Sequence, residues 1–171
     1  MLSKKSIEEY KRIYKKEFGN EISDQEASEQ VTNLVKFFEI LHKINVTDKI
    51  RKKKLKQHPK GFNLPESEIY NCCICGDSVQ GKTSWYDKNG IKCLLCQKAL
   101  DQDIIPPKVC HDSDSWYAMW QLKDKFGFHY QTVKKMIRLG ELKARIILDN
   151  NNKPYFHVFL KEENKGKLIL N

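Results

Sequence analysis

Apolar residues recur at helical spacing along the first 44 residues of the chain. Two segments each carry an apolar stripe, and Gly19-Asn20 separates them. Ser-x-x-Glu sequences at Ser6 and Ser23 have the form of a capping box, which satisfies the free amides at a helix start. The stripes consist of Ile7, Tyr10, Tyr14 and Phe18, and then of Ala27, Val31, Leu34, Val35, Phe38 and Leu41. The pattern predicts a helical hairpin over residues 1–44.

Two interpretations of these apolar stripes stay open. Both faces can be used up in the core of the hairpin itself. Because two helices make a thin core, the outer face can also serve for docking of a protein partner or for dimerisation with a second copy.

The segment 45–70 changes from an amphipathic pattern to a basic one. Its basic run consists of Lys49, Arg51, Lys52, Lys53, Lys54 and Lys56. Turn-forming residues come next, in His58-Pro59-Lys60-Gly61 and at Pro65. We therefore expect a basic linker with about one helical turn. Its charges either lie along phosphates or are simply solvated.

The next segment combines a hairpin pattern with paired cysteines. Lys88-Asn89-Gly90 is a strong turn signal, and the apolar residues Trp85, Tyr86 and Ile91 flank it. Two Cys-x2-Cys pairs lie on either side, separated by 17 residues: Cys72 and Cys75, then Cys93 and Cys96. Two such turns that meet across a hairpin make a tetrahedral site of four thiolates, which suits structural Zn2+. Residues 71–105 are therefore predicted to be a zinc ribbon.

A redox site is the alternative for these cysteines, but a thioredoxin-like site needs one such motif and this chain has two. Four thiolates saturate zinc, so Cys73 and the Cys110-His111 pair are left outside the site. Pro106-Pro107 is expected to end the ribbon. Because so short a segment buries little core, chelation should unfold residues 71–100 before it affects the C-terminal third of the chain.

From Trp116 the spacing becomes helical again. One helix is expected over Trp116–Phe126 and a second over about residues 129–139, with Gly127 between them. Two short helices joined by a tight turn are typical of a helix-turn-helix. Strand-like runs at Ala144–Leu148 and Tyr155–Phe159 flank an Asn-rich turn, which predicts a two-stranded wing. We expect this domain to cover residues 112–160, with a tail at 161–171.

The charge of the chain favours an acidic partner. The net charge is +9, with 31 basic and 22 acidic side chains, so nucleic acid is the simplest partner. Residues 1–44 are neutral, and the excess lies in residues 45–70 and in residues 111–171, where 11 basic side chains face 7 acidic ones. The C-terminal third is therefore the expected contact surface.

The second helix of this region offers side chains that can contact nucleic acid. Val133, Met136 and Ile137 should face inward, which leaves polar and basic residues outside. Those best placed for base edges are His129, Tyr130, Gln131 and Lys134. Those expected to meet phosphates are Lys135, Arg138, Lys143 and Arg145.

The stretch Lys125–Leu142 resembles the winged helix-turn-helix of excisionase and MerR-type DNA-binding proteins. Residues that fall in register with this family are Gly127, Thr132, Val133, Ile137, Gly140, Glu141 and Leu142. The resemblance extends over about Trp116–Phe159. Leu122 and Lys123 stand where the family has small residues, and His129 stands where it has a Ser cap. The resemblance implies duplex DNA binding, with the second helix in the major groove and the wing beside it.

Together these patterns predict an α+β protein of several modules that binds double-stranded DNA in a sequence-specific way. A transcription regulator or an accessory factor of a mobile element would fit. An RNA- or ribosome-associated zinc-ribbon protein is one alternative, because Trp85 and Tyr86 could stack on bases. A protein-interaction adaptor, or an antitoxin-like protein, is another.

The sequence contains no recognised catalytic set, so an enzyme is not expected. It has no P-loop, no Gly-x-Ser-x-Gly and no His-Glu-x-x-His motif. No secretory signal opens the chain and its apolar runs are short, so we expect a cytoplasmic protein, nucleoid-associated if it binds DNA, without a membrane or a small-molecule substrate.

Overall fold

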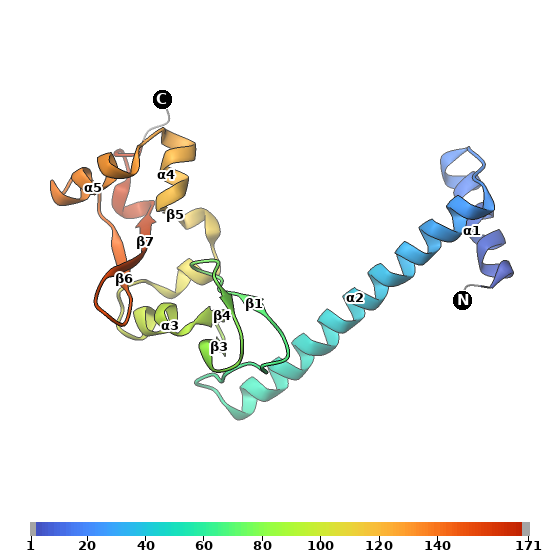
Figure 1. Ribbon diagram of the computed structural model, residues 1–171, viewed down its shortest axis with the longest axis horizontal. Coiled ribbons are helices and arrows are strands. Elements are labelled where there is room, and N and C mark those ends of the chain that lie inside the picture. The colour runs from blue at the N-terminus through green and yellow to red at the C-terminus, as the bar shows by residue number, and fades with distance from the viewer. Residues whose placement is uncertain (1–2, 169–171) are drawn as a thin grey trace. The chain divides into compact units, whose positions relative to one another are not determined.

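The computed structural model describes residues 3–168 and combines helices with small antiparallel sheets (Figure 1). The chain divides into two compact units between Gln57 and His58. The first unit is helical, and the second contains all strands of the described residues.

Helix α1 spans Lys4–Phe18, and its cap lies three residues before the expected one. Ser3 is its cap, because the Ser3 side chain accepts a hydrogen bond from the Ser6 amide at 3.1 Å. Gly19 ends α1 in the left-handed conformation, with φ of 74°. Ser6 therefore lies inside the helix, and the helix start that was predicted at Ser6 is wrong by about one turn.

Helix α2 spans Asp24–Gln57, and its start agrees with the sequence. Ser23 and Glu26 form a reciprocal capping box: the Ser23 amide donates to the Glu26 carboxylate at 2.9 Å, and the Glu26 amide donates to Ser23 Oγ at 3.2 Å. Its end disagrees, because residues 45–57 of the expected linker are helical. Lys, Arg, Leu and Gln favour helix, and the next breaker after α2 is Pro59.

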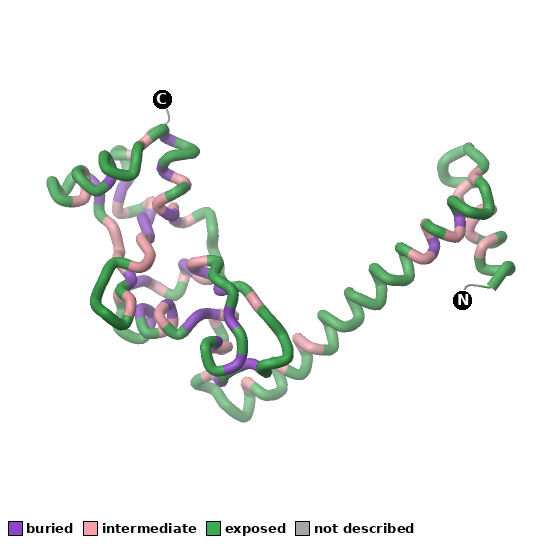
Figure 2. Tube along the Cα trace, in the orientation of Figure 1, coloured by how far each residue is buried: buried purple, intermediate pink, exposed green. Residues whose placement is uncertain are grey.

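The two helices pack through their first halves. Tyr10 Oη donates to Gln30 Oε1 at 2.8 Å, and the Lys11 ammonium contacts the Asp24 carboxylate at 2.5 Å. Ala27 and Val31 are the buried residues of α2. The later members of its predicted stripe, Leu34, Val35, Phe38 and Leu41, are exposed. The hairpin core is therefore much smaller than the apolar face that the sequence carries (Figure 2).

The second unit begins with two short antiparallel ribbons and a helix. Strands β1 (Tyr70–Asn71) and β2 (Ser78–Val79) pair, as do β3 (Ser84–Asp87) and β4 (Gly90–Cys93). Helix α3, Leu94–Asp101, follows β4 directly and was not expected from the sequence. The Asn-Gly turn forms as expected, since Gly90 has φ of 97° and pairs with Asp87.

A three-stranded sheet and two helices complete the second unit. Its strand order is β5 (Trp116–Ala118), β7 (Pro154–Leu160) and β6 (Arg145–Leu148). Helices α4 (Met119–Phe126) and α5 (Tyr130–Arg138) lie between β5 and β6 in the chain. The expected helix start at Trp116 is wrong, because residues 116–118 pair with β7 and bury Trp116 and Ala118 on one face of the sheet.

Two apolar clusters hold this unit together. One joins α4 and α5 to the sheet through Leu122, Phe126, Val133, Leu142 and Phe159. The other contains Cys72, Cys93 and Cys96 together with sheet residues such as Ile147, Val158 and Leu160. The cysteine-containing segment and the sheet therefore share one core, although the sequence predicted separate modules at 71–105 and 112–160.

Within residues 3–168, no helix is both long enough and apolar enough to cross a membrane.

Candidate metal centre and nucleic-acid interface

Four cysteine side chains meet where the two short ribbons approach each other. The Sγ atoms of Cys72, Cys75, Cys93 and Cys96 all lie within 4.8 Å of one another. Cys72 and Cys75 lie in the β1–β2 turn, Cys93 ends β4 and Cys96 lies in the first turn of α3. The structure thus brings together the four cysteines that the sequence spacing predicted to form one site.

Local backbone geometry points these thiols at one another. The Gly76 amide donates to the Cys72 carbonyl at 3.0 Å, and Gly76 has φ of 81°, a conformation that favours glycine. Cys93 caps α3, because its Sγ accepts from the Cys96 amide at 3.4 Å. Each Cys-x2-Cys sequence therefore forms a tight turn that presents two sulfur atoms to the same point.

The electrostatics of the cluster fit a bound cation. Hydrogen bonds from Cys75, Cys93 and Cys96 lower the pKa of Cys72, whereas hydrogen bonds with Cys72, Cys75 and Cys93 raise the pKa of Cys96. Four thiols this close cannot all lose their protons without a positive charge between them. Cys72, Cys93 and Cys96 are buried, so water cannot screen that repulsion. A thiophilic divalent ion would supply the charge and complete the core.

Tyr155 ties the three-stranded sheet to this centre. From β7, its hydroxyl donates to Cys75 Sγ at 3.3 Å and also contacts the Asp77 carboxylate. Burial, followed by these hydrogen bonds, raises the pKa of Tyr155, so the phenol keeps its proton and donates at neutral pH. Sequence reasoning missed this residue, since 80 positions separate Tyr155 from Cys75.

A buried ion pair lies in the adjacent hairpin. Lys92 is fully buried, and its Nζ donates to Asp87 Oδ1 at 2.5 Å and to the Gly90 carbonyl at 2.9 Å. The same carboxylate oxygen accepts from the Asn89 amide at 2.7 Å. Asp87 therefore fixes both the lysine and the turn. In the sequence, the position of Asp87 directly before the Asn-Gly turn was the signal that could have indicated this role.

Cys73, Cys110 and His111 lie outside the group of four thiols. The Cys73 thiol donates to the Asn89 carbonyl at 3.8 Å, and its interaction with the Cys110 thiol raises the pKa of Cys73 and lowers that of Cys110. His111 Nε2 lies 3.2 Å from Asn89 Oδ1. These residues pack beside the metal centre and are not part of the cluster.

Helix α5 presents a polar and basic face. His129 caps the helix, with Nδ1 accepting from the Gln131 amide at 3.3 Å, and Val133 is fully buried. Lys134 Nζ lies 4.4 Å from the centre of the Tyr130 ring. Six of the eight expected contact residues lie on α5 or at its cap, and all six are exposed: His129, Tyr130, Gln131, Lys134, Lys135 and Arg138. Gln131, Lys135 and Arg138 lie on the side of α5 opposite the buried Val133, and Lys134 flanks them.

An aromatic groove adjoins this face. Trp120, from α4, is one of the residues that line the groove and is 63% exposed. The groove is lined by Met119, Trp120, Lys123, Phe128, Tyr130, Pro154, Tyr155, Phe156 and His157. Burial, followed by repulsion from Lys134, lowers the pKa of His157. The groove therefore borders the basic face of α5, and no sequence argument had singled it out.

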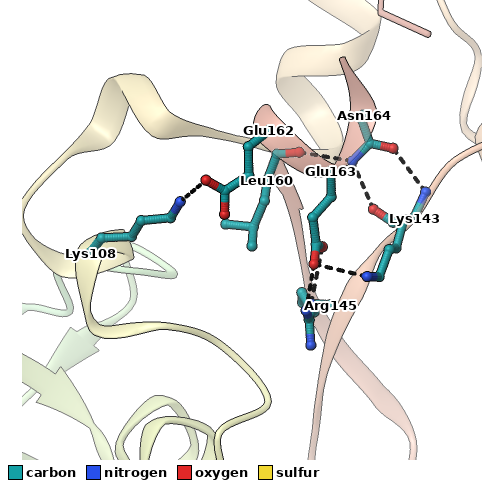
Figure 3. Close-up of polar contacts among 7 residues, drawn as sticks. All are labelled: Lys108, Lys143, Arg145, Leu160, Glu162, Glu163 and Asn164. Carbon is teal, nitrogen blue, oxygen red and sulfur yellow. Dashed lines mark hydrogen bonds and ion pairs between the residues drawn. The ribbon is translucent and has the colours of Figure 1, made fainter. Parts of the chain in front are cut away.

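The last two expected phosphate contacts are engaged within the protein. Arg145 binds the Glu163 carboxylate through Nε at 3.1 Å and Nη2 at 2.5 Å, and Lys143 Nζ reaches it at 2.9 Å (Figure 3). These bonds, led by the one from Arg145, lower the pKa of Glu163 to about 2. Asn164 further bonds the Lys143 amide and carbonyl. Both cations therefore hold the start of β6 against residues 162–164, the turn that follows β7.

Compared with known protein families, curated proteins and solved structures, the chain has no match.

Proposed function

We propose that the second unit binds double-stranded DNA through the exposed face of α5. The observation that supports this proposal is the grouping of Gln131, Lys134, Lys135 and Arg138 on one solvated face of a capped helix. A helix of this width fits the major groove, where glutamine pairs with adenine and lysine or arginine with guanine.

The side chains divide into two roles in this proposal. Tyr130, Gln131 and Lys134, near the start of α5, would contact base edges, and His129 would do so from its cap. Lys135 and Arg138 would contact phosphates. Because Glu163 already neutralises part of the charge of Lys143 and Arg145, we assign those two the positioning of the β6–β7 hairpin as a wing beside α5.

We further propose that the thiol cluster holds structural Zn2+ with no open coordination position. The ion would fix the turn that carries Cys75, and Tyr155 would transmit that restraint to β7. The protein as a whole would act as a transcription regulator or as an accessory factor of a mobile element, in the cytoplasm and on the nucleoid.

Fluorescence anisotropy with labelled duplex DNA tests the assignment of α5. Replacing Lys134 and Lys135 by alanine should abolish binding, and wild-type affinity should fall steeply with salt because phosphate binding releases counterions. The matched control is Lys82→Ala/Lys88→Ala, which removes two exposed lysines from the ribbon segment and should keep most of the affinity. Equal affinity for both double variants would reject α5 as the contact helix.

Binding of RNA or single-stranded DNA is a second candidate function, favoured by the aromatic groove. Trp120 and Tyr130 are exposed next to Lys123 and Lys134, an arrangement that suits stacked bases and their phosphates. The ribbon aromatics are less suited, since Tyr86 packs on Phe62 with ring centres 5.4 Å apart. The same anisotropy assay with single strands and structured RNA separates the candidates, and a failure of all three ligands would favour a protein-interaction adaptor.

A further inference from the structure

Helix α2 carries a long apolar surface that α1 leaves exposed. Nine of its large apolar side chains are at least 41% exposed. They are Leu34, Val35, Phe37, Phe38, Ile40, Leu41, Ile44, Val46 and Ile50. Figure 2 shows the helix as exposed along most of its length. An apolar surface of this extent on one helix marks an interaction site.

Helix α1 is too short to cover this face. It has 15 residues against 34 in α2, so at about 1.5 Å per residue it spans less than half of its partner. The two buried residues of α2, Ala27 and Val31, both lie in its first eight residues. Helix α1 therefore leaves the remainder of this face uncovered.

Three of the exposed residues point away from α1. At about 100° per residue, Phe37, Ile40 and Ile44 lie some 120–180° around the helix from Val31. Because Val31 is on the side that α1 covers, a further helix can lie along the other three while α1 keeps its place.

The distribution of charge along α2 favours a second copy of the same helix as its partner, in an antiparallel orientation. Residues 24–39 carry four acidic side chains and one basic one, whereas residues 40–57 carry seven basic side chains and one acidic one. A parallel pair of such helices would place like charges side by side. An antiparallel pair that crosses near Leu41 places each acidic half against the basic half of the other copy.

We propose that α2 is the dimer interface of this protein and pairs antiparallel with α2 of a second copy. The proposal is independent of DNA binding, since it uses residues of the first unit alone. It also gives the basic run of α2 a protein partner, namely the acidic first half of the same helix in the other copy.

Sedimentation equilibrium of the full chain tests the interface. The wild type should be a dimer at micromolar concentration, and Ile40→Glu/Ile44→Glu should be monomeric with unchanged helical circular dichroism, because both side chains are exposed within one copy. The control is Ile69→Glu, which changes a residue of the second unit that is 70% exposed and should leave the dimer intact. A monomeric wild type, or a dimeric Ile40→Glu/Ile44→Glu variant, would overturn the proposal.

Carbodiimide cross-linking of mixed 15N-labelled and unlabelled protein tests the direction, because it joins carboxylates to amines that touch. Antiparallel pairing that crosses near Leu41 predicts mixed-isotope links between Glu29 of one copy and Lys52, Lys53 or Lys54 of the other. Mixed-isotope links from Asp48 to Lys49 or Lys52 would instead indicate a parallel pair. A dimer that lacks the predicted links would also contradict the antiparallel arrangement.

Discussion

Lys92 is fully buried, and the carboxylate of Asp87 balances its charge. The pair is held by the Gly90 carbonyl and the Asn89 amide, so each charged group keeps several hydrogen bonds. Such a pair adds little stability over apolar residues of equal size, but the loss of one partner leaves an uncompensated charge in the core.

Replacement of Lys92 by methionine should therefore destabilise the second unit by about 3 kcal/mol, because Asp87 would stay buried without its partner. Urea unfolding followed by tryptophan fluorescence measures the change. Lys88→Met is the control, since Lys88 is exposed in the same hairpin and its loss should cost less than about 0.5 kcal/mol. Equal midpoints for the two variants would show that the buried pair contributes nothing specific.

Among the elements, those with strong local signals could be predicted and those fixed by distant contacts could not. The capping box at Ser23, the Asn-Gly hairpin and helix α5 each depend on residues within a few positions of one another. Strand β5 was missed because its conformation depends on pairing with β7, some 40 residues later. The second half of α2 was predicted to be part of a linker because of its run of basic residues, although lysine and arginine favour helix.

The metal centre shows the same limit within one site. Its four candidate ligands follow from cysteine spacing alone, whereas Tyr155 reaches Cys75 only after the fold brings β7 beside it. Lys143 and Arg145 were assigned to phosphates from their charge. Their partner Glu163 lies about 20 residues away, so the sequence alone did not pair them.

The hydrogen bond from Tyr155 gives strand β7 a measurable role at the metal centre. Tyr155→Phe removes the donor to Cys75 Sγ and should lower zinc affinity by roughly tenfold, because groups that bond a ligand orient it and tune its charge. Competition with a chromogenic chelator measures the affinity. Tyr130→Phe serves as the control, since Tyr130 is exposed on α5 and should have no effect. An unchanged affinity in Tyr155→Phe would remove Tyr155 from the site.

For the whole molecule, the second unit is one body and not a chain of modules. The thiol cluster, α3 and the three-stranded sheet share a core that includes Trp116, Val158 and Leu160. The sequence predicted that chelation would unfold residues 71–100 first. Because these residues share a core with the sheet, we do not expect them to unfold alone. In our account the metal stabilises the sheet on which α5 and its basic face are built, and the first unit supplies the surface for a second copy.

Selection of bound sequences from a random duplex pool by the zinc-loaded full chain tests the proposed function most directly. We predict that a defined DNA motif is enriched, and that Gln131→Ala relaxes the preference at an adenine position within it, since glutamine pairs bidentately with adenine. A pool that stays random after repeated rounds with the wild-type protein would contradict sequence-specific DNA binding.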